Sequence, residues 1–307
     1  KIRGHFKIEY TKKWVKLIWL PLYFAIPGII YRSDVIIFTI ITGAIVGLVF
    51  WTAAIAVSTI ISHSGLIARA IYPKMLIGEG DKYLQSNFTQ FFYFAFPLTA
   101  IVIIFAKPAL FTLNPQYIEA HLVLIFLAFQ VFFTTLGGVI ELTIVGKENV
   151  DVNKKSKYRD YLKSKLFLMP NLEIIQHSIY IILLITGLLL LSSTYSNLEL
   201  VIYWSILSMI TRIPFTIYRY ILLQKNVKVK FELKIIIKYL ISSITIFGLT
   251  FLITDKFLIY NERIFEFLPN LLIFVVIGIS GYLIMTYLID FRTRNLIHAI
   301  LKELKKK

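Results

Sequence analysis

Residues 17–72 read LIWLPLYFAIPGIIYRSDVIIFTIITGAIVGLVFWTAAIAVSTIISHSGLIARAIY. Two long apolar segments are joined here by a short turn at Gly43, and the charged side chains are Arg32, Asp34 and Arg69. An apolar segment of about 20 residues can cross the hydrocarbon core of a bilayer as a helix. The stretch therefore predicts two consecutive transmembrane helices with opposite directions.

The same pattern recurs along the whole chain. Hydrophobic residues make up 58% of the 307, and the mean hydropathy is +0.76, whereas a soluble domain is about half apolar and interleaves its charges. This composition excludes a soluble globular enzyme and predicts an all-α integral membrane protein. The eight expected transmembrane helices cover residues 17–42, 45–72, 88–111, 119–145, 174–193, 199–223, 234–254 and 267–290.

The basic side chains gather in alternate connections between these blocks. With 33 basic and 17 acidic residues the net charge is +16. About 26 of the basic residues lie in the terminal segments and the even-numbered connections, whereas the other connections hold three, which are Lys107, Lys256 and Arg263. By the positive-inside rule, both termini are expected to be cytoplasmic and the protein to span the cytoplasmic membrane. A nucleic-acid partner is not expected, because the aromatic residues lie inside the apolar blocks.

Charge and hydropathy divide the chain into three parts. Residues 1–16 are expected to form a basic cytoplasmic linker, and residues 17–224 a six-helix unit with a cytoplasmic loop at 147–173. Residues 225–307 are expected to add two accessory transmembrane helices and a basic tail. Because the chain starts on a basic run without methionine or a signal-peptide layout, we expect it to be a fragment that lacks an upstream portion.

Three charged residues lie deep inside predicted helices. Arg32 and Asp34 fall in the outer half of the first helix, and Arg212 lies beside Pro214 in the sixth. A charge near the bilayer centre costs about 2.5 to 3.5 kcal/mol on insertion scales. Arg32 and Asp34 are two residues apart and point away from each other on a helix. We therefore expect these three side chains to face a water-filled cavity, another helix or a ligand.

Two other helices carry stripes of small and polar residues. The second helix places Ala54, Ser58, Ser62, Gly65 and Arg69 on one face, and the fourth places Thr134, Gly137, Gly138 and Glu141 on one face. Stripes of small residues usually indicate close helix packing. For the fourth helix, packing and a cavity lined by Glu141 are both open interpretations.

Other polar residues have simpler expected roles. Arg69 and Arg219 lie near the cytoplasmic ends of their helices, from which their side chains are expected to snorkel to the interface. His63, His121 and His177 are expected to be interfacial or hydrogen-bonded. Pro27 and Gly28 in the first helix and Pro214 in the sixth are candidate hinges, because proline removes a backbone hydrogen bond.

The sequence lacks the motifs of several enzyme classes. It contains no glycine-rich phosphate loop, HExxH motif or Ser-His-Asp set, and no cysteine. We therefore expect neither catalysis nor a cofactor or metal. A channel is also disfavoured, because no filter-like polar loop is present.

Several motifs in the first half carry a resemblance to a known family. They are Arg32-Ser33-Asp34, Gly43, the run from Gly47 to Ala54, Ile71-Tyr72-Pro73, Pro97, the turn from Phe111 to Ala120, and Leu124 to Leu127. In these features the chain resembles the polysaccharide-transport branch of the MOP exporter superfamily, the Wzx-like lipid-linked oligosaccharide flippases. The resemblance implies a MATE/MOP-like fold, in which residues 17–224 are the second six-helix lobe and the last two helices are accessory.

The resemblance also implies a mechanism and partners. Two lobes rock around a central cavity by alternating access, and a polyprenyl-pyrophosphate-linked glycan passes its head group through that cavity while its lipid stays in the bilayer. Arg32, Arg212 and Arg69 are then expected to bind the pyrophosphate. Asp34 and Glu141 are the expected cavity acids, with Asp34 holding an arginine in register or binding a coupling cation. The missing first lobe and membrane lipids are the other expected partners.

Three alternatives remain open at this stage. A cation-coupled exporter of amphipathic drugs would use Asp34 as its proton or sodium site. An integral membrane polymerase or glycosyltransferase would need acidic residues on an outer loop, and the candidates are Glu119, Asp255, Glu262 and Glu266. A membrane scaffold subunit is a third possibility, which the arginines inside the helices disfavour.

Overall fold

The computed structural model of the chain describes residues 18–66, 81–148, 150, 158–227, 229 and 231–304, together with Ile8 and Val15. All regular elements within these residues are helices. They are α2 (Trp19–Thr42), α3 (Ile45–Ser58), η1 (Thr59–Gly65), α6 (Asp81–Ile104), α7 (Ala106–Leu113), η2 (Pro115–Ala120), α8 (His121–Val145), α9 (Tyr158–Lys163), α10 (Lys165–Leu191), α11 (Asn197–Val227), α12 (Leu233–Phe257), α13 (Ile264–Ile289) and α14 (Phe291–Leu304).

Eight helical segments in the described part of the chain are long and apolar enough to cross a membrane. They are Pro21–Thr42, Ile45–Gly65, Tyr83–Ile104, Pro115–Val145, Lys165–Leu191, Asn197–Val227, Leu233–Phe257 and Ile264–Ile289. The predictions of an all-helical chain and of eight apolar spans are thus confirmed. Eight such spans are the hallmark of a multi-pass membrane protein.

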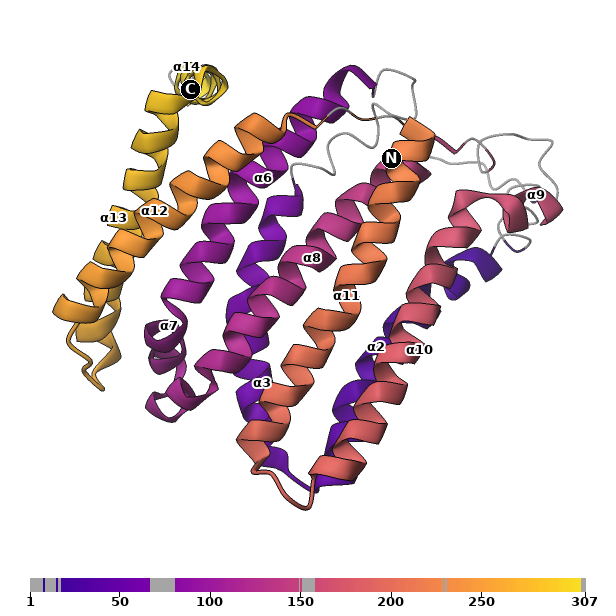
Figure 1. Cartoon of the computed structure of the whole chain (residues 1–307), viewed down its shortest axis with the longest axis horizontal. Coiled ribbons are helices and arrows are strands. Elements are labelled where there is room, and N and C mark those ends of the chain that lie inside the picture. The colour runs from indigo at the N-terminus through magenta and orange to yellow at the C-terminus, as the bar shows by residue number, and fades with distance from the viewer. Residues whose placement is uncertain are drawn as a thin grey trace.

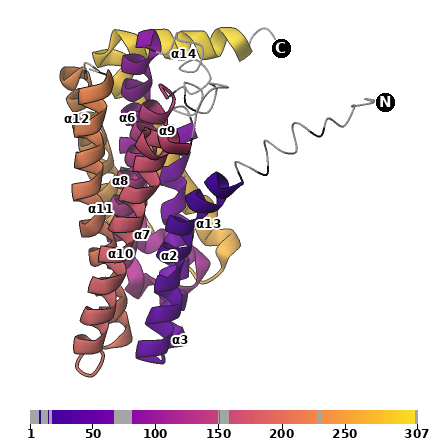
Figure 2. The ribbon, with the colours of Figure 1, turned by 90° about the vertical axis from the view of Figure 1, so that its right-hand side faces the viewer.

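The spans lie side by side and alternate in direction (Figures 1 and 2). Contacts between neighbours lead from α13 through α12, α6, α8, α11 and α10 to α2, while α3 packs against α8 and α11. One end of the bundle carries α9, α14 and the junction between α11 and α12 (Figure 1). We call this the basic end, because the basic connections in the sequence join helices there.

The turn between α2 and α3 shows how the first hairpin is made. Gly43 ends α2 in the left-handed conformation (φ 64°) and donates its backbone N–H to the carbonyl of Thr39 at 2.9 Å. Glycine adopts this conformation without the steric penalty of a Cβ atom. The two helices nevertheless share few contacts, since α2 packs mainly along α10.

A central aromatic stack fixes α3 to α11. The rings of Trp51 and Trp204 are parallel with centroids 3.7 Å apart, and the ring of Phe38 also stacks on Trp204, with centroids 4.8 Å apart. All three side chains are buried. Burying large apolar rings stabilises each by a few kcal/mol, so this stack sets the register between α2, α3 and α11.

The last two spans attach to the edge of the bundle through tyrosines. Tyr93 of α6 contacts Tyr239 of α12 and Tyr282 of α13, with ring centroids 5.0 and 5.6 Å apart. The Tyr282 hydroxyl also donates to the backbone carbonyl of Tyr93 at 2.8 Å. α12 and α13 therefore pack on α6 and α7, away from α10 and α2 (Figure 1).

Two boundaries differ from the sequence prediction. The loop predicted to reach residue 173 is wrong, because α10 begins at Lys165 and buries Met169 and Pro170. The predicted span begins only after Glu173, at residue 174. A charged side chain inside a span is costly, and the pairing of Glu173 described below offsets that cost. The third predicted span is broken, since Phe105 forms a turn between α6 and α7. Arg69 and, apart from Ile8 and Val15, the predicted linker 1–16 lie outside the described residues.

Candidate functional site

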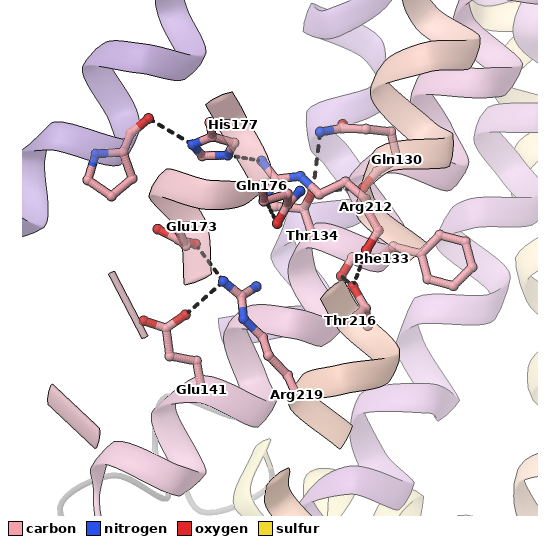
Figure 3. A network of polar contacts seen from close by, with 11 residues as sticks. Gln130, Phe133, Thr134, Glu141, Glu173, Gln176, His177, Arg212, Thr216 and Arg219 are labelled. Atoms are coloured by element: carbon pink, nitrogen blue, oxygen red, sulfur yellow. Dashed lines mark hydrogen bonds and ion pairs between the residues drawn. The ribbon is translucent and has the colours of Figure 1, made fainter. Parts of the chain in front are cut away.

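Polar side chains of four helices meet in the interior of the bundle, between α2, α8, α10 and α11 (Figure 3). On α11 they recur every three or four residues, from Ser208 through Arg212 and Thr216 to Arg219, and on α10 they run from Glu173 through His177 to Tyr180. This spacing places each set on one helix face. The two faces meet and form three neighbouring clusters.

The first is the Arg219 cluster, made of Glu141, Glu173 and Arg219. Nη2 of Arg219 lies 3.0 Å from Oε1 of Glu173 and 3.6 Å from Oε2 of Glu141 (Figure 3). The arginine side chain is 3% exposed, and the carboxylates are 22% and 30% exposed. The snorkelling predicted for Arg219 is therefore wrong, because two carboxylates from α8 and α10 neutralise the guanidinium inside the protein.

Gly137 makes room for this cluster on α8. A Cβ atom at this position would lie 2.9 Å from Nη1 of Arg219, which is too close for a real contact. A Cβ atom at Gly138 would meet nothing within 4 Å. The small-residue stripe on α8 thus serves close packing at Gly137, and Glu141 on the same helix is an ion-pair partner of Arg219.

The second is the Arg212 cluster, made of Tyr31, Gln176, His177 and Arg212. The guanidinium donates to Nε2 of His177 at 3.0 Å and lies over the ring of Tyr31, 5.5 Å from its centroid. With its amide oriented to face the guanidinium, Gln176 accepts from Nε at 3.1 Å and from Nη1 at 3.2 Å.

Arg212 has no carboxylate partner in this cluster. The residue is only 6% exposed, and among the described residues no carboxylate lies within 4 Å of its guanidinium. An unpaired buried charge is costly and is normally neutralised by an opposite charge. Arg212 is therefore a buried cation whose charge is not neutralised by an ion pair within the described residues.

The hydrogen bonds of His177 fix its tautomer. Its Nδ1 lies 2.8 Å from the carbonyl oxygen of Pro27, which can only accept. Its Nε2 faces Arg212, which can only donate. The ring is therefore neutral with the proton on Nδ1. Because His177 belongs to α10, its two hydrogen bonds connect α10 to both α2 and α11. As predicted, this histidine is hydrogen-bonded.

The third is the Asp34 cluster, made of Asp34, Tyr180 and Trp204. The Tyr180 hydroxyl donates to Oδ2 of Asp34 at 2.8 Å and accepts from the indole N–H of Trp204 at 2.6 Å. Asp34 is 2% exposed. Among the described residues, no arginine lies within 4 Å of the Asp34 carboxylate, and the side chain that donates to it is Tyr180.

Tyr31 connects the second and third clusters. Its ring centroid lies 5.2 Å from that of His177 and 5.8 Å from that of Tyr180. The polar faces of α2, α10 and α11 are therefore continuous from Asp34 to Arg219.

Arg32 lies apart from these clusters. Its side chain is exposed on α2, and in the described part of the chain it forms no hydrogen bond or ion pair. The structure thus brings Arg212 and Asp34 into the interior but leaves Arg32 on the surface. Of the candidate hinges, Pro27 contributes its carbonyl to His177, whereas Gly28 and Pro214 lie within continuous helices.

The sequence prediction did not include the residues of α10 in the site. Glu173 lies in the predicted loop, and His177 is predicted only as a single hydrogen-bonded residue. Gln176 and Tyr180 lie in the predicted span and carry no prediction. Their spacing of three or four residues, repeated over two helical turns, is the signal that would have identified them as one helix face.

The acidic residues predicted to lie on outer loops do not form a comparable site within the described residues. Glu119, Asp255 and Glu262 are exposed, and Glu266 pairs with Arg263 at 3.0 Å. Among the described residues no group of three or more His, Cys, Asp or Glu side chains is placed to hold a metal ion.

The chain matches no protein-family model, no curated protein and no solved structure.

Proposed function

We propose that this chain is part of a membrane transporter that moves polyprenyl-pyrophosphate-linked oligosaccharides across the cytoplasmic membrane by alternating access. The observation that carries the proposal is the buried guanidinium of Arg212, held among neutral partners inside a bundle of apolar helices. A pyrophosphate would supply the missing negative charge. The resemblance to the polysaccharide-transport branch of the MOP superfamily supplies the class of substrate.

The contacts of Arg212 support phosphate binding for a chemical reason. A guanidinium presents five N–H donors in a planar fork that matches two phosphate oxygens. Gln176 and His177 are neutral acceptors, and a phosphate oxygen is a stronger one. Phosphate can therefore displace them from the arginine, whereas it would have to compete with two carboxylates at Arg219.

The same displacement would loosen the helices. In the resting arrangement, Arg212 reaches α10 through Gln176 and His177, and His177 reaches α2 through the carbonyl of Pro27. Losing these bonds would free α2 and α10, which pack along each other, to move together against α8 and α11. In this proposal residues 17–224 form one lobe, and the other lobe is contributed by a further segment or subunit.

Transport by the intact protein in liposomes tests the proposal. A fluorescent polyprenyl-pyrophosphate-linked disaccharide would be followed by its protection from a membrane-impermeant quencher. We expect Arg212→Gln to slow flipping at least 10-fold and Lys238→Gln, which removes an exposed charge on α12, to leave it within 2-fold. Flipping by Arg212→Gln at the wild-type rate, with equal incorporation, would show that the phosphate site is wrong.

Asp34 supports a second candidate, a cation-coupled exporter of the same superfamily. Its carboxylate is buried, and in the described part of the chain no cationic side chain lies within 4 Å of it. Transport that requires a sodium or proton gradient, and that Asp34→Asn uncouples from the gradient, would favour this candidate. Gradient-independent flipping would exclude it.

A further inference from the structure

A polar pocket lies at the basic end of the bundle, far along the fold from the Arg212 cluster. It has a volume of about 470 Å³ and lies between α6, α12 and α14. Its lining includes Gln85, Thr89, Gln90, Tyr239, Arg292 and Asn295. The residues that line the pocket come from segments about 200 residues apart in the sequence. The proposed transport function does not use this pocket.

The position of α14 puts this pocket at the level of lipid headgroups. α14 lies across the end of the bundle, whereas the spans run along it (Figure 2). Its sequence separates apolar from charged residues around the helix, and such helices lie in the plane of the membrane interface. Because α13 ends directly before α14, the pocket opens where the spans leave the hydrocarbon core.

The wall formed by α14 is held rigidly. Asp290 caps the helix, accepting from the backbone N–H of Thr293 at 3.2 Å, and it also accepts from the hydroxyl of Tyr239 at 2.5 Å. One oxygen of Glu232 accepts from both Arg292 and Gln85. These bonds join α14 to α12 and α6, so the pocket is formed without a ligand.

The side chains that line the pocket indicate which class of ligand it can bind. The lining combines one cation, Arg292, with several neutral amides and hydroxyls. Two carboxylates bond to lining residues: Glu232 accepts from Arg292 and Gln85, and Asp290 accepts from Tyr239 and Thr293. The Arg292 side chain is 48% exposed, and only one of its terminal nitrogens is bonded to Glu232. One negative charge surrounded by hydroxyl groups fits this set.

We propose that the pocket binds a glycerol phosphate group, with Arg292 on the phosphate and the amides of α6 and α14 on the hydroxyls. Two sources share this chemistry, namely the headgroup of phosphatidylglycerol in the membrane and free glycerol 3-phosphate. The proposal concerns a different end of the molecule from the Arg212 cluster and does not depend on the transported substrate.

Equilibrium binding to the purified chain in detergent tests it. The probes are short-chain phosphatidylglycerol, short-chain phosphatidylcholine and glycerol 3-phosphate. We expect phosphatidylglycerol to bind at least 10-fold more tightly than phosphatidylcholine. Competition by glycerol 3-phosphate at similar affinity would assign the pocket to the free compound, and failure to compete would assign it to the lipid.

Two arginines of α14 provide matched variants. Arg292 lines the pocket, whereas Arg294 lies over the ring of Phe291, 5.7 Å from its centroid, and does not line it. We expect Arg292→Gln to weaken binding at least 10-fold, Asn295→Ala about 3-fold, and Arg294→Gln less than 2-fold. An equal loss in both arginine variants, or no preference for phosphatidylglycerol, would overturn the proposal. Asn295→Ala keeps the bond between Arg292 and Glu232, so it tests the pocket even where Arg292→Gln unfolds.

Discussion

Arg212 and Arg219 lie two turns apart on the same face of α11, and both are buried. Arg219 is neutralised by Glu141 and Glu173, whereas Arg212 contacts the neutral groups of Gln176, His177 and Tyr31. The same residue type on one helix therefore has two roles. The paired arginine fastens α8, α10 and α11 together, and the one without a carboxylate partner is the one that we propose binds an anion.

The largest effect is expected at the paired arginine. Arg219→Gln leaves two carboxylates facing each other without a cation, and breaking a buried ion pair costs about 3 to 5 kcal/mol. We expect the free energy of unfolding in detergent to fall by about 3 kcal/mol. The triple variant Arg219→Gln, Glu141→Gln, Glu173→Gln, which removes all three charges, should recover most of the loss. A loss below about 1 kcal/mol in the single variant would remove the distinction between the two arginines.

A smaller effect is expected at Tyr180, which supports Asp34. Tyr180→Phe removes a hydrogen bond to a carboxylate and leaves the Trp204 N–H unpaired, at a cost of about 2 kcal/mol. Tyr203→Phe is the matched control, because its hydroxyl donates to the carbonyl of Leu183 on an exposed surface. Equal losses in chemical unfolding of the two variants would contradict the role of the Asp34 cluster.

The two glycines of α8 separate packing from helix propensity. Gly137→Ala places a methyl group against Nη1 of Arg219, whereas Gly138→Ala meets open space. Alanine itself favours a helix by about 1 kcal/mol over glycine. Gly137→Ala should therefore be about 1 to 2 kcal/mol less stable than Gly138→Ala in thermal unfolding. Identical stabilities would show that Arg219 moves aside freely.

Arg32 should show the smallest effect on stability. Its side chain is exposed and unpaired within the described residues, so Arg32→Gln should change the unfolding free energy by less than about 0.5 kcal/mol. Any effect of this variant on transport would then report a contact made with the substrate or with another lobe. A stability loss above about 1 kcal/mol would reveal an unrecognised contact of Arg32 within the chain.

Hydropathy predicts the eight spans because burial of apolar helices in a bilayer depends on composition and length. The same reasoning identifies Arg212 and Asp34 as residues that need partners. Hydropathy gives the wrong location for the Arg219 side chain, because it takes account of the distance from this residue to the helix end but not of the carboxylates of Glu141 on α8 and Glu173 on α10. Which side chains meet depends on helix packing, and Glu173 lies 46 residues from Arg219 in sequence.

The basic tail illustrates the same limit at the other end of the chain. The positive charge of this tail predicts that it lies on the cytoplasmic side of the membrane. The pocket between α6, α12 and α14 requires the cap at Asp290 and the bonds of Glu232 to Arg292 and Gln85. These contacts join segments that are distant in the sequence, so no local sequence pattern predicts them.

Equilibrium binding of a polyprenyl pyrophosphate to the purified protein is the decisive experiment for the proposal that Arg212 binds the phosphate. Farnesyl pyrophosphate serves as the probe, with farnesol as the uncharged comparison. We predict that Arg212→Gln weakens pyrophosphate binding at least 10-fold, that Arg212→Lys has an intermediate effect because it keeps the charge without the fork, and that farnesol binding is unchanged. Lys238→Gln is the charge control. Equal pyrophosphate affinity of the wild type and Arg212→Gln would show that Arg212 does not bind the phosphate.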